Sequence, residues 1–196
     1  MTQIVTGLRE RKRGRVVAVE LDGRPWRVLP ADAVARAGLV VGRPLDRQTA
    51  RELGREVRRA KALAAAARSL AAADRSERAL EQRLMRAGHS PAAREDAIAS
   101  LTRAGVLDEA RLAESRAELL ARRGYGDAAI RADLARRQIA PEAAANAVAA
   151  LEPELDRLRS ALEGQSVTPA VLRRLAARGF SRDTLDEVAS AFALKA

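Results

Sequence analysis

One apolar pattern recurs three times along the chain at the same internal spacing, and it constrains the fold more than any other feature. Its anchors are Leu84, Leu134 and Leu175. Four residues before each anchor stands Leu80, Ile130 or Val171, and five residues after it stands His89, Ile139 or Phe180. Seventeen residues after each anchor stands Leu101, Leu151 or Phe192. Residues four apart share a helix face, whereas a reach of seventeen needs a second helix beyond a tight turn. Self-similarity at about 40–50 residues predicts a tandem array of helical hairpins.

Residues that start and stop helices divide most of the chain into groups of three helices. Ser90-Pro91 and Thr168-Pro169 are typical helix starts, and Asp74 with Glu77 has the spacing of a capping box. We therefore expect a mainly α fold, in which three tandem three-helix repeats form an elongated curved array behind a small β-rich N-terminal module. Such arrays usually bind an extended partner. The expected boundaries are 1–45 for the β-rich module, 46–104 for a linker helix and the first repeat, 105–152 for the second repeat and 153–196 for the third.

The β-rich module is predicted from strand-like runs at residues 4–8, 16–21 and 26–29. Asp22-Gly23 is a strong signal for a two-residue hairpin turn between the second and third runs. A short helix is expected after Pro30, ending at Gly38. Trp26, the only tryptophan, is predicted to anchor the core of this module.

The charge of the chain is +10 and is unevenly distributed. Residues 1–60 contain 14 Lys and Arg against 7 Asp and Glu, whereas residues 61–196 contain 22 against 19. The run from Arg9 to Arg15 carries five positive charges and one negative, which suits contact with DNA or with an acidic protein surface. No aromatic residues interleave with this run, so base stacking is not indicated. The nearly balanced repeats suit contact with protein.

Several classes of protein are disfavoured by what the sequence contains. Cysteine is absent and His89 is the only histidine, so we expect no thiol chemistry, no His-based metal site and no catalytic triad. No phosphate-binding loop is present. We expect a non-enzymatic, monomeric cytoplasmic protein without cofactor or metal, since no apolar run is long enough for a membrane span. Helix–turn–helix readout of DNA is disfavoured because Asp183, Asp186 and Glu187 would face phosphates.

Four segments, in order, resemble motifs of the RecX family, which regulates the RecA recombinase. The similarity covers about residues 55–194, and the β-rich module resembles an extra module of some members. In three places the chain departs from the family pattern: Gln138 replaces a glycine, Leu112 a phenylalanine and Glu109 an aspartate. The four segments are Asp74 to Leu80, Gly105 to Ala113, Arg122 to Gly126 with Ile130 to Leu134, and Arg178 to Phe180.

The resemblance implies a protein that lies in the groove of the RecA filament on single-stranded DNA and restrains its ATPase, strand exchange and the SOS response. Two alternatives stay open: a protein that binds single- or double-stranded DNA directly through the basic N-terminal module, and a helical scaffold for some other partner. The candidate residues for contact with RecA or DNA are all basic. They are Arg11, Lys12, Arg13, Arg15, Arg75, Arg116, Arg122, Arg123, Arg131, Arg137, Arg173, Arg174 and Arg178.

Overall fold

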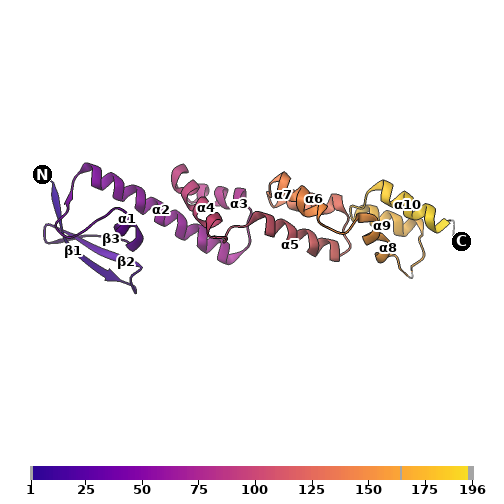
Figure 1. The fold of residues 1–196 in the computed structure, drawn as a ribbon, viewed down its shortest axis with the longest axis horizontal. Helices are drawn as coiled ribbons and strands as arrows, with labels where there is room; N and C mark the ends of the chain where they lie inside the picture. Colours follow the sequence, from indigo (N-terminus) through magenta and orange to yellow (C-terminus); the bar gives the residue numbers. More distant parts are fainter. Residues whose placement is uncertain (1, 164, 194–196) are drawn as a thin grey trace. The chain divides into compact units, whose positions relative to one another are not determined.

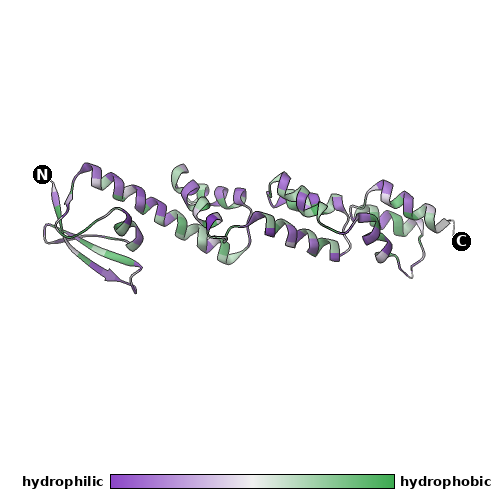
Figure 2. Ribbon diagram, in the orientation of Figure 1, coloured by the Kyte–Doolittle hydropathy of each residue, from purple (hydrophilic) through white to green (hydrophobic). Residues whose placement is uncertain are grey.

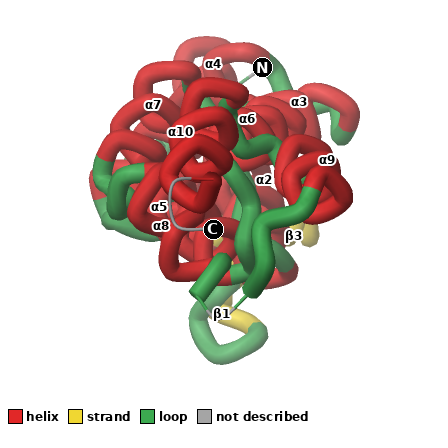
Figure 3. The backbone as a smooth tube through the Cα atoms, turned by 90° about the vertical axis from the view of Figure 1, so that its right-hand side faces the viewer, coloured by secondary structure: helices red, strands yellow, loops and turns green. Residues whose placement is uncertain are grey.

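The computed structural model describes residues 2–163 and 165–193, and most of them are helical. Figure 3 shows the predominance of helix, and within the described residues all four strands precede residue 46. The prediction of a mainly α chain with a small β-rich N-terminal module is therefore confirmed. The chain divides into two compact units. The first unit comprises Met1–Ala73 and Leu80–Leu107, and the second comprises Asp74–Ala79 and Asp108–Ala196.

A four-stranded antiparallel sheet begins the first unit (Figure 1). Its strands lie in the order β3-β2-β1-β4, so β3 is an edge strand. Alternate residues of β2 are buried, which places Val17, Val19 and Leu21 in a core with Val34 and Leu53 from the helices. β4 was not expected from the sequence, because two residues carry no periodic signal. The strands are β1 (Gln3–Arg11), β2 (Val16–Leu21), β3 (Arg24–Pro30) and β4 (Pro44–Leu45), and helix α1 (Ala31–Arg36) follows β3.

The turn between β2 and β3 forms at Asp22-Gly23, as predicted. Both residues have positive φ, 49° and 78°, which is the backbone of a type I′ hairpin turn. The Asp22 carboxylate also accepts a hydrogen bond from the backbone N–H of Ile4 at 2.9 Å. This bond ties the turn to the neighbouring strand β1.

Helix α2 (Arg47–Ala72) is continuous through Gly54 and connects the sheet with the first helical group. Asp46 caps its first turn by accepting a hydrogen bond from the backbone N–H of Thr49 at 2.7 Å. Figure 2 colours the early turns of α2 mainly hydrophilic and the late turns mainly hydrophobic. Leu53 packs into the sheet core, whereas Ala62 and Ala66 pack into the next core. One helix therefore belongs to two cores.

The first helical group is completed by α3 (Glu77–Arg86) and α4 (Pro91–Arg103). Leu80, Leu84 and Leu101 of the recurring pattern are buried in its core. The predicted capping box of Asp74 and Glu77 is wrong. The Ser76 hydroxyl accepts from the backbone N–H of Ala79 at 3.3 Å instead, because α3 begins at Glu77 and Asp74 lies too early to cap it.

The second unit contains two further helical groups. In the first of them Ile130, Leu134 and Ile139 are buried together, and in the next Leu175 and Phe180 are buried. The predicted core position Phe192 has a side chain outside the described part of the structure. The helices are α5 (Glu109–Arg122), α6 (Asp127–Arg136) and α7 (Pro141–Ala149), followed by α8 (Glu154–Ala161), α9 (Pro169–Ala177) and α10 (Arg182–Ala193).

The middle helix of each group ends on a residue with left-handed backbone. Gly88 after α3 has φ of 79° and Gly179 after α9 has φ of 85°. Gln138 after α6 occupies the same position with φ of 59°. Gln138 therefore has the left-handed backbone conformation that glycine has in the other two groups, although a residue with a side chain adopts it less readily.

Candidate partner-binding surfaces

The turn between β1 and β2 exposes four of the predicted contact residues, Arg11, Lys12, Arg13 and Arg15. Lys12 and Arg13 have left-handed backbone, with φ of 51° and 57°. Within the described residues none of the four side chains has an acidic partner within 4.0 Å, so they form an unneutralised basic tip, here called the hairpin tip. This arrangement suits a polyanion or an acidic surface.

Trp26 is not a core anchor, so that prediction is wrong. Its side chain is 36% exposed, and the core of the module is made of aliphatic residues. The cause lies in the register of β3, an edge strand. Val19 pairs with Arg27 and Glu20 pairs with Pro25, which leaves Trp26 as the extra residue of a β-bulge. The Arg27 guanidinium lies over the indole, 5.1 Å from the ring centroid.

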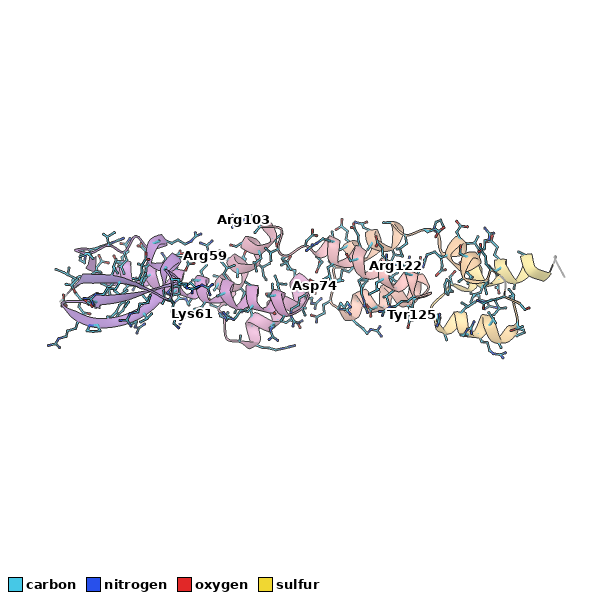
Figure 4. The ribbon with its side chains drawn as sticks, turned by 90° about the horizontal axis from the view of Figure 1, so that it is seen from below. Arg59, Lys61, Asp74, Arg103, Arg122 and Tyr125 are labelled. Atoms are coloured by element: carbon cyan, nitrogen blue, oxygen red, sulfur yellow. The ribbon has the colours of Figure 1, made fainter. Side chains whose placement is uncertain are left out.

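A hollow of about 440 Å³ between α2 and α3 gathers three further arginines that sequence reasoning did not select. Arg68, Arg83 and Arg86 line it, and within the described residues none of them has a hydrogen-bonded or ion-paired partner. The buried Ser69 hydroxyl in its wall also has no hydrogen-bond partner in this part of the chain. A sequence signal existed, because Arg58, Lys61 and Arg68 recur at helical spacing on α2. Lys61 is labelled in Figure 4.

Two predicted contact residues in the second unit, Arg116 and Arg137, pair with the carboxylate of Asp133. Arg116 donates to the Asp133 carboxylate from Nε at 2.7 Å and from a terminal nitrogen at 3.2 Å, and Arg137 donates at 3.0 Å. The Arg116 hydrogen bond holds the pKa of Asp133 well below its usual range. Burial opposes this shift, and Arg137 adds to it. The pKa of Arg116 is raised in turn by its bond to Asp133. The Arg116 side chain is half-buried in this contact, whereas the Arg137 side chain remains exposed.

The other predicted arginines differ in whether their side chains already form contacts within the protein. Arg122 pairs with Glu118 at 3.2 Å and Arg131 with Asp127 at 3.4 Å, both one helical turn apart. Arg178 lies over the ring of Tyr125, 5.9 Å from its centroid. Arg75 has a buried Nε with no hydrogen-bond partner among the described residues. Among these arginines, the exposed side chains with neither an ion pair nor a ring contact in the described part are those of Arg123, Arg173 and Arg174.

Twice in the second unit, a glutamate at the start of one helix holds the starts of two other helices in the same way. Glu154, the first residue of α8, accepts hydrogen bonds from the backbone N–H of Asp127 at 2.7 Å and of Ser181 at 3.1 Å. It thereby holds the starts of α6 and α10. Glu109, the first residue of α5, accepts from the backbone N–H of Glu77 at 3.1 Å and of Ala140 at 3.3 Å. We call each arrangement a joint.

Burial at the joint raises the pKa of Glu154, but hydrogen bonds from Asp127, Ser181 and Thr184 outweigh it and leave the pKa below its usual value. Arg157 supports the same joint by donating to the Tyr125 carbonyl at 3.1 Å and to the Asp127 carboxylate. Backbone groups also meet here, since the Gly126 N–H donates to the Arg178 carbonyl at 3.0 Å. A side chain at Gly126 would collide with the backbone of Gly179.

At the first joint the Ser76 hydroxyl takes the role of the Gly126 N–H. It donates to the Arg137 carbonyl at 2.8 Å. Sequence reasoning missed these joints because Glu109 lies 25 residues before Leu134, whereas Glu154 lies 21 residues before Leu175. The first helices of the two groups differ in length, so no fixed spacing marks the two glutamates.

A second hollow, of about 380 Å³, lies between α5 and α8 in the second unit. Leu151 and Phe180 give it an apolar wall, and Glu118, Arg122 and Arg157 give it charged edges. Arg122 comes from the end of α5, close in sequence to Tyr125 (Figure 4). The shape and lining suit an apolar side chain from a protein partner.

The net charge is confined to one of the two units. The first unit has 20 Lys and Arg against 10 Asp and Glu, whereas the second has 16 against 16. Among the described residues no group of His, Cys, Asp or Glu could hold a metal ion. No described helix is both long enough and apolar enough to span a membrane.

Comparison with known proteins identifies the second helical group directly. A family model described as RecX, second three-helix domain, matches residues 108–148, which contain α5, α6 and all but the last residue of α7. No curated protein sequence matches the chain.

Two solved structures share the fold. A crystal structure of regulatory protein RecX has a TM-score of 0.79 at 17% identity and covers 96% of this chain and 99% of its own. A crystal structure of RecX from Lactobacillus salivarius has a TM-score of 0.59 at 18% identity and covers 70% of this chain and 97% of its own. The chain therefore carries one segment that matches a RecX three-helix domain, and it shares the fold of the RecX structures along nearly its whole length.

Proposed function

We propose that the protein is a negative modulator of RecA that binds the RecA filament on single-stranded DNA and restrains its ATPase, strand exchange and SOS activity. The observation that carries this proposal is the RecX three-helix domain at residues 108–148 within a RecX fold. The regulatory activity comes from the family, and the residues below are our assignment to this chain.

The division of charge supports a partner that combines protein with nucleic acid. The second unit is neutral and many of its arginines are already ion-paired, so it suits the surface of another protein. The first unit carries all of the +10 charge, which suits a polyanion. A RecA filament on single-stranded DNA offers both surfaces in one assembly.

Within the second unit we assign RecA contact to the exposed arginines without internal partners, Arg123, Arg173 and Arg174. The hollow lined by Leu151 and Phe180 would accept an apolar side chain of RecA. Arg116 and Arg137 are assigned to stability, because Asp133 holds both of them.

The test is the DNA-dependent ATPase of the cognate RecA, preassembled on single-stranded DNA and titrated with the protein below RecA stoichiometry. A parallel series contains a large excess of single-stranded DNA. Inhibition that survives the excess DNA supports direct binding to the filament. Inhibition that the excess DNA removes would contradict it.

A charge-reversed variant locates the contact. Arg173→Glu combined with Arg174→Glu should weaken inhibition roughly 10-fold or more, as expected for loss of a charged contact at an interface. Arg111→Glu is the control, because Arg111 is an exposed helical arginine of the same unit outside the candidate set, and its ion pair is with Asp108 at 3.9 Å. Equal inhibition by both variants would place the contact elsewhere.

The second candidate function is direct DNA binding by the N-terminal module, favoured by the unneutralised hairpin tip. It predicts that deleting residues 1–45 abolishes inhibition of the ATPase, and that binding weakens steeply with salt. Inhibition that persists after this deletion would exclude it.

A further inference from the structure

The exposed side of β3 is the one place in the described structure where a tryptophan meets unpaired basic side chains. Every residue from Arg24 to Val28 is exposed, with Val28 at 56% and Trp26 at 36%. An exposed indole on an edge strand contributes nothing to the core of the module, which is complete without it. Its position therefore suits binding.

The hairpin tip lies at the far end of the same strand. The backbone N–H of Ala31, directly after β3, donates to the Arg15 carbonyl at 3.2 Å. At about 3.3 Å per residue the line from Arg24 to Pro30 spans roughly 20 Å. Basic groups thus stand at both ends of this line, with Trp26 and Val28 between them.

Among the described residues, no carboxylate lies within 4.0 Å of a basic group of the hairpin tip or of Arg24. The Glu10 carboxylate lies beside Gly14 at the tip but forms no ion pair there. Glu20 pairs with Arg9 at 3.7 Å and lies against Gly7, where a side chain would displace it. The Asp22 carboxylate accepts from the backbone of Ile4. The positive potential along β3 is therefore available to a partner.

Stacking aromatics combined with arginines along a strand are how proteins bind single-stranded nucleic acid, since unstacked bases offer a free ring face and the backbone offers charge. An acidic protein would use the arginines but gain little from the indole. A duplex would use the charge, but its bases are already stacked.

We propose that β3 and the hairpin tip form a binding site for single-stranded nucleic acid. One base stacks on the face of Trp26 that Arg27 leaves open, and Arg15, Arg24 and the other tip residues contact phosphates. This site is separate from the RecA contact assigned above, and its test contains no RecA, so either proposal can fail without the other.

The test uses the full chain, because Trp26 is its only tryptophan and its emission reports on this site alone. Titration with a short oligothymidylate at low salt should quench the emission to a plateau. A duplex of the same length should quench it far less. Absence of quenching while the strand is bound, or equal quenching by the duplex, would overturn the proposal.

Variants measure the contribution of the ring to affinity for a labelled oligothymidylate, read by fluorescence anisotropy. Trp26→Ala should weaken binding roughly 5- to 100-fold, the range for loss of one base–aromatic stack. Trp26→Phe keeps a ring and should stay within about 3-fold of the parent. Thermal unfolding followed by circular dichroism checks that each variant is folded.

Tyr125→Ala is the matched control. Tyr125 is also exposed and also lies beneath an arginine, but it belongs to the neutral second unit. The Tyr125→Ala variant should bind the single-stranded oligonucleotide as tightly as the parent. Trp26→Ala binding as tightly as Tyr125→Ala would overturn the stacking role.

Discussion

Three arginines converge on the carboxylate of Asp133, namely Arg116, Arg136 and Arg137. Arg116 comes from α5 and Asp133 from α6, so this pair ties two helices of one group together. The other two lie about one turn after Asp133, Arg136 as the last residue of α6 and Arg137 as its C-cap. Residues of this kind decide the stability of a group and are poor candidates for binding a partner.

Asp133→Asn should lower the free energy of unfolding at neutral pH by about 2 kcal/mol, because Arg116 loses its charged partner in a half-buried place. The Arg116 bond lowers the pKa of Asp133 in the folded state. Its contribution is therefore fully present above the ordinary Asp pKa of about 3.9 and declines as the pH falls below it.

Urea unfolding of parent and variant at pH 7, 5 and 3 measures this difference. The difference in the free energy of unfolding between parent and variant should be the same at pH 7 and pH 5, and smaller at pH 3. The control is Asp156→Asn. The Asp156 side chain is half exposed and its ion pair is with Arg159 at 3.4 Å, so the change should alter stability by less than about 0.5 kcal/mol. A gap at pH 3 as large as at pH 7 would contradict the assignment.

Residue roles were harder to predict from sequence than residue burial. Leu84, Leu134 and Leu175 were expected in cores and are buried there. Apolar residues at helical spacing predict directly which face of a helix is buried. Trp26 was misplaced because a β-bulge changes which side chains an edge strand exposes, and no periodic pattern reports a bulge. Glu109 and Glu154 were missed because their bonds go to backbone N–H groups, which leave no trace in side-chain spacing.

At the scale of elements, the end of α6 carries a residue that its geometry disfavours. Gln138→Gly should raise the free energy of unfolding by about 0.5–1 kcal/mol, because glycine reaches φ of 59° without steric penalty but gains freedom when unfolded. Thermal unfolding measures the change.

Gly88→Ala is the mirror experiment at the end of α3. Gly88 has φ of 79° and open space around it, so the loss of about 1 kcal/mol expected there comes from the backbone alone. A stabilised Gly88→Ala or a destabilised Gln138→Gly would show that side-chain contacts outweigh backbone strain at these positions.

The helix caps at the starts of α5 and α9 formed as the sequence predicts, whereas the cap at the start of α3 did not. Asp108 and Thr168 cap α5 and α9 by accepting hydrogen bonds from N–H groups three residues later, as their positions predict. The Ser76 cap on the N–H of Ala79 is equally local, but the spacing of Asp74 and Glu77 favoured the wrong residue. The second bond of the Ser76 hydroxyl, to the carbonyl of Arg137, spans 61 residues. A contact of that range follows from tertiary structure and not from local sequence.

At the scale of the molecule, the joints should make the helical groups of the second unit unfold together. Glu154→Ala removes the acceptor for the N–H groups of Asp127 and Ser181 and for the Thr184 hydroxyl, with an expected loss of about 2–3 kcal/mol. Hydrogen exchange should show α8 and α10 losing protection before α5 and α7.

Asp156→Ala is the control, because it removes another carboxylate from the first turn of α8 but not from the joint. It should leave the order of exchange as in the parent. Equal loss of protection across all six helices in Glu154→Ala would mean that the groups are coupled by some other contact.

The joints also bear on how such a chain can change its length. Each joint requires one glutamate at a helix start, a small residue before the middle helix of the preceding group, and otherwise backbone groups that every residue possesses. A duplicated group of three helices would offer the same hydrogen-bond partners to both of its neighbours. The chain can therefore lengthen by whole groups without any new kind of contact. Insertion of a single helix would leave a glutamate without a helix start to hold.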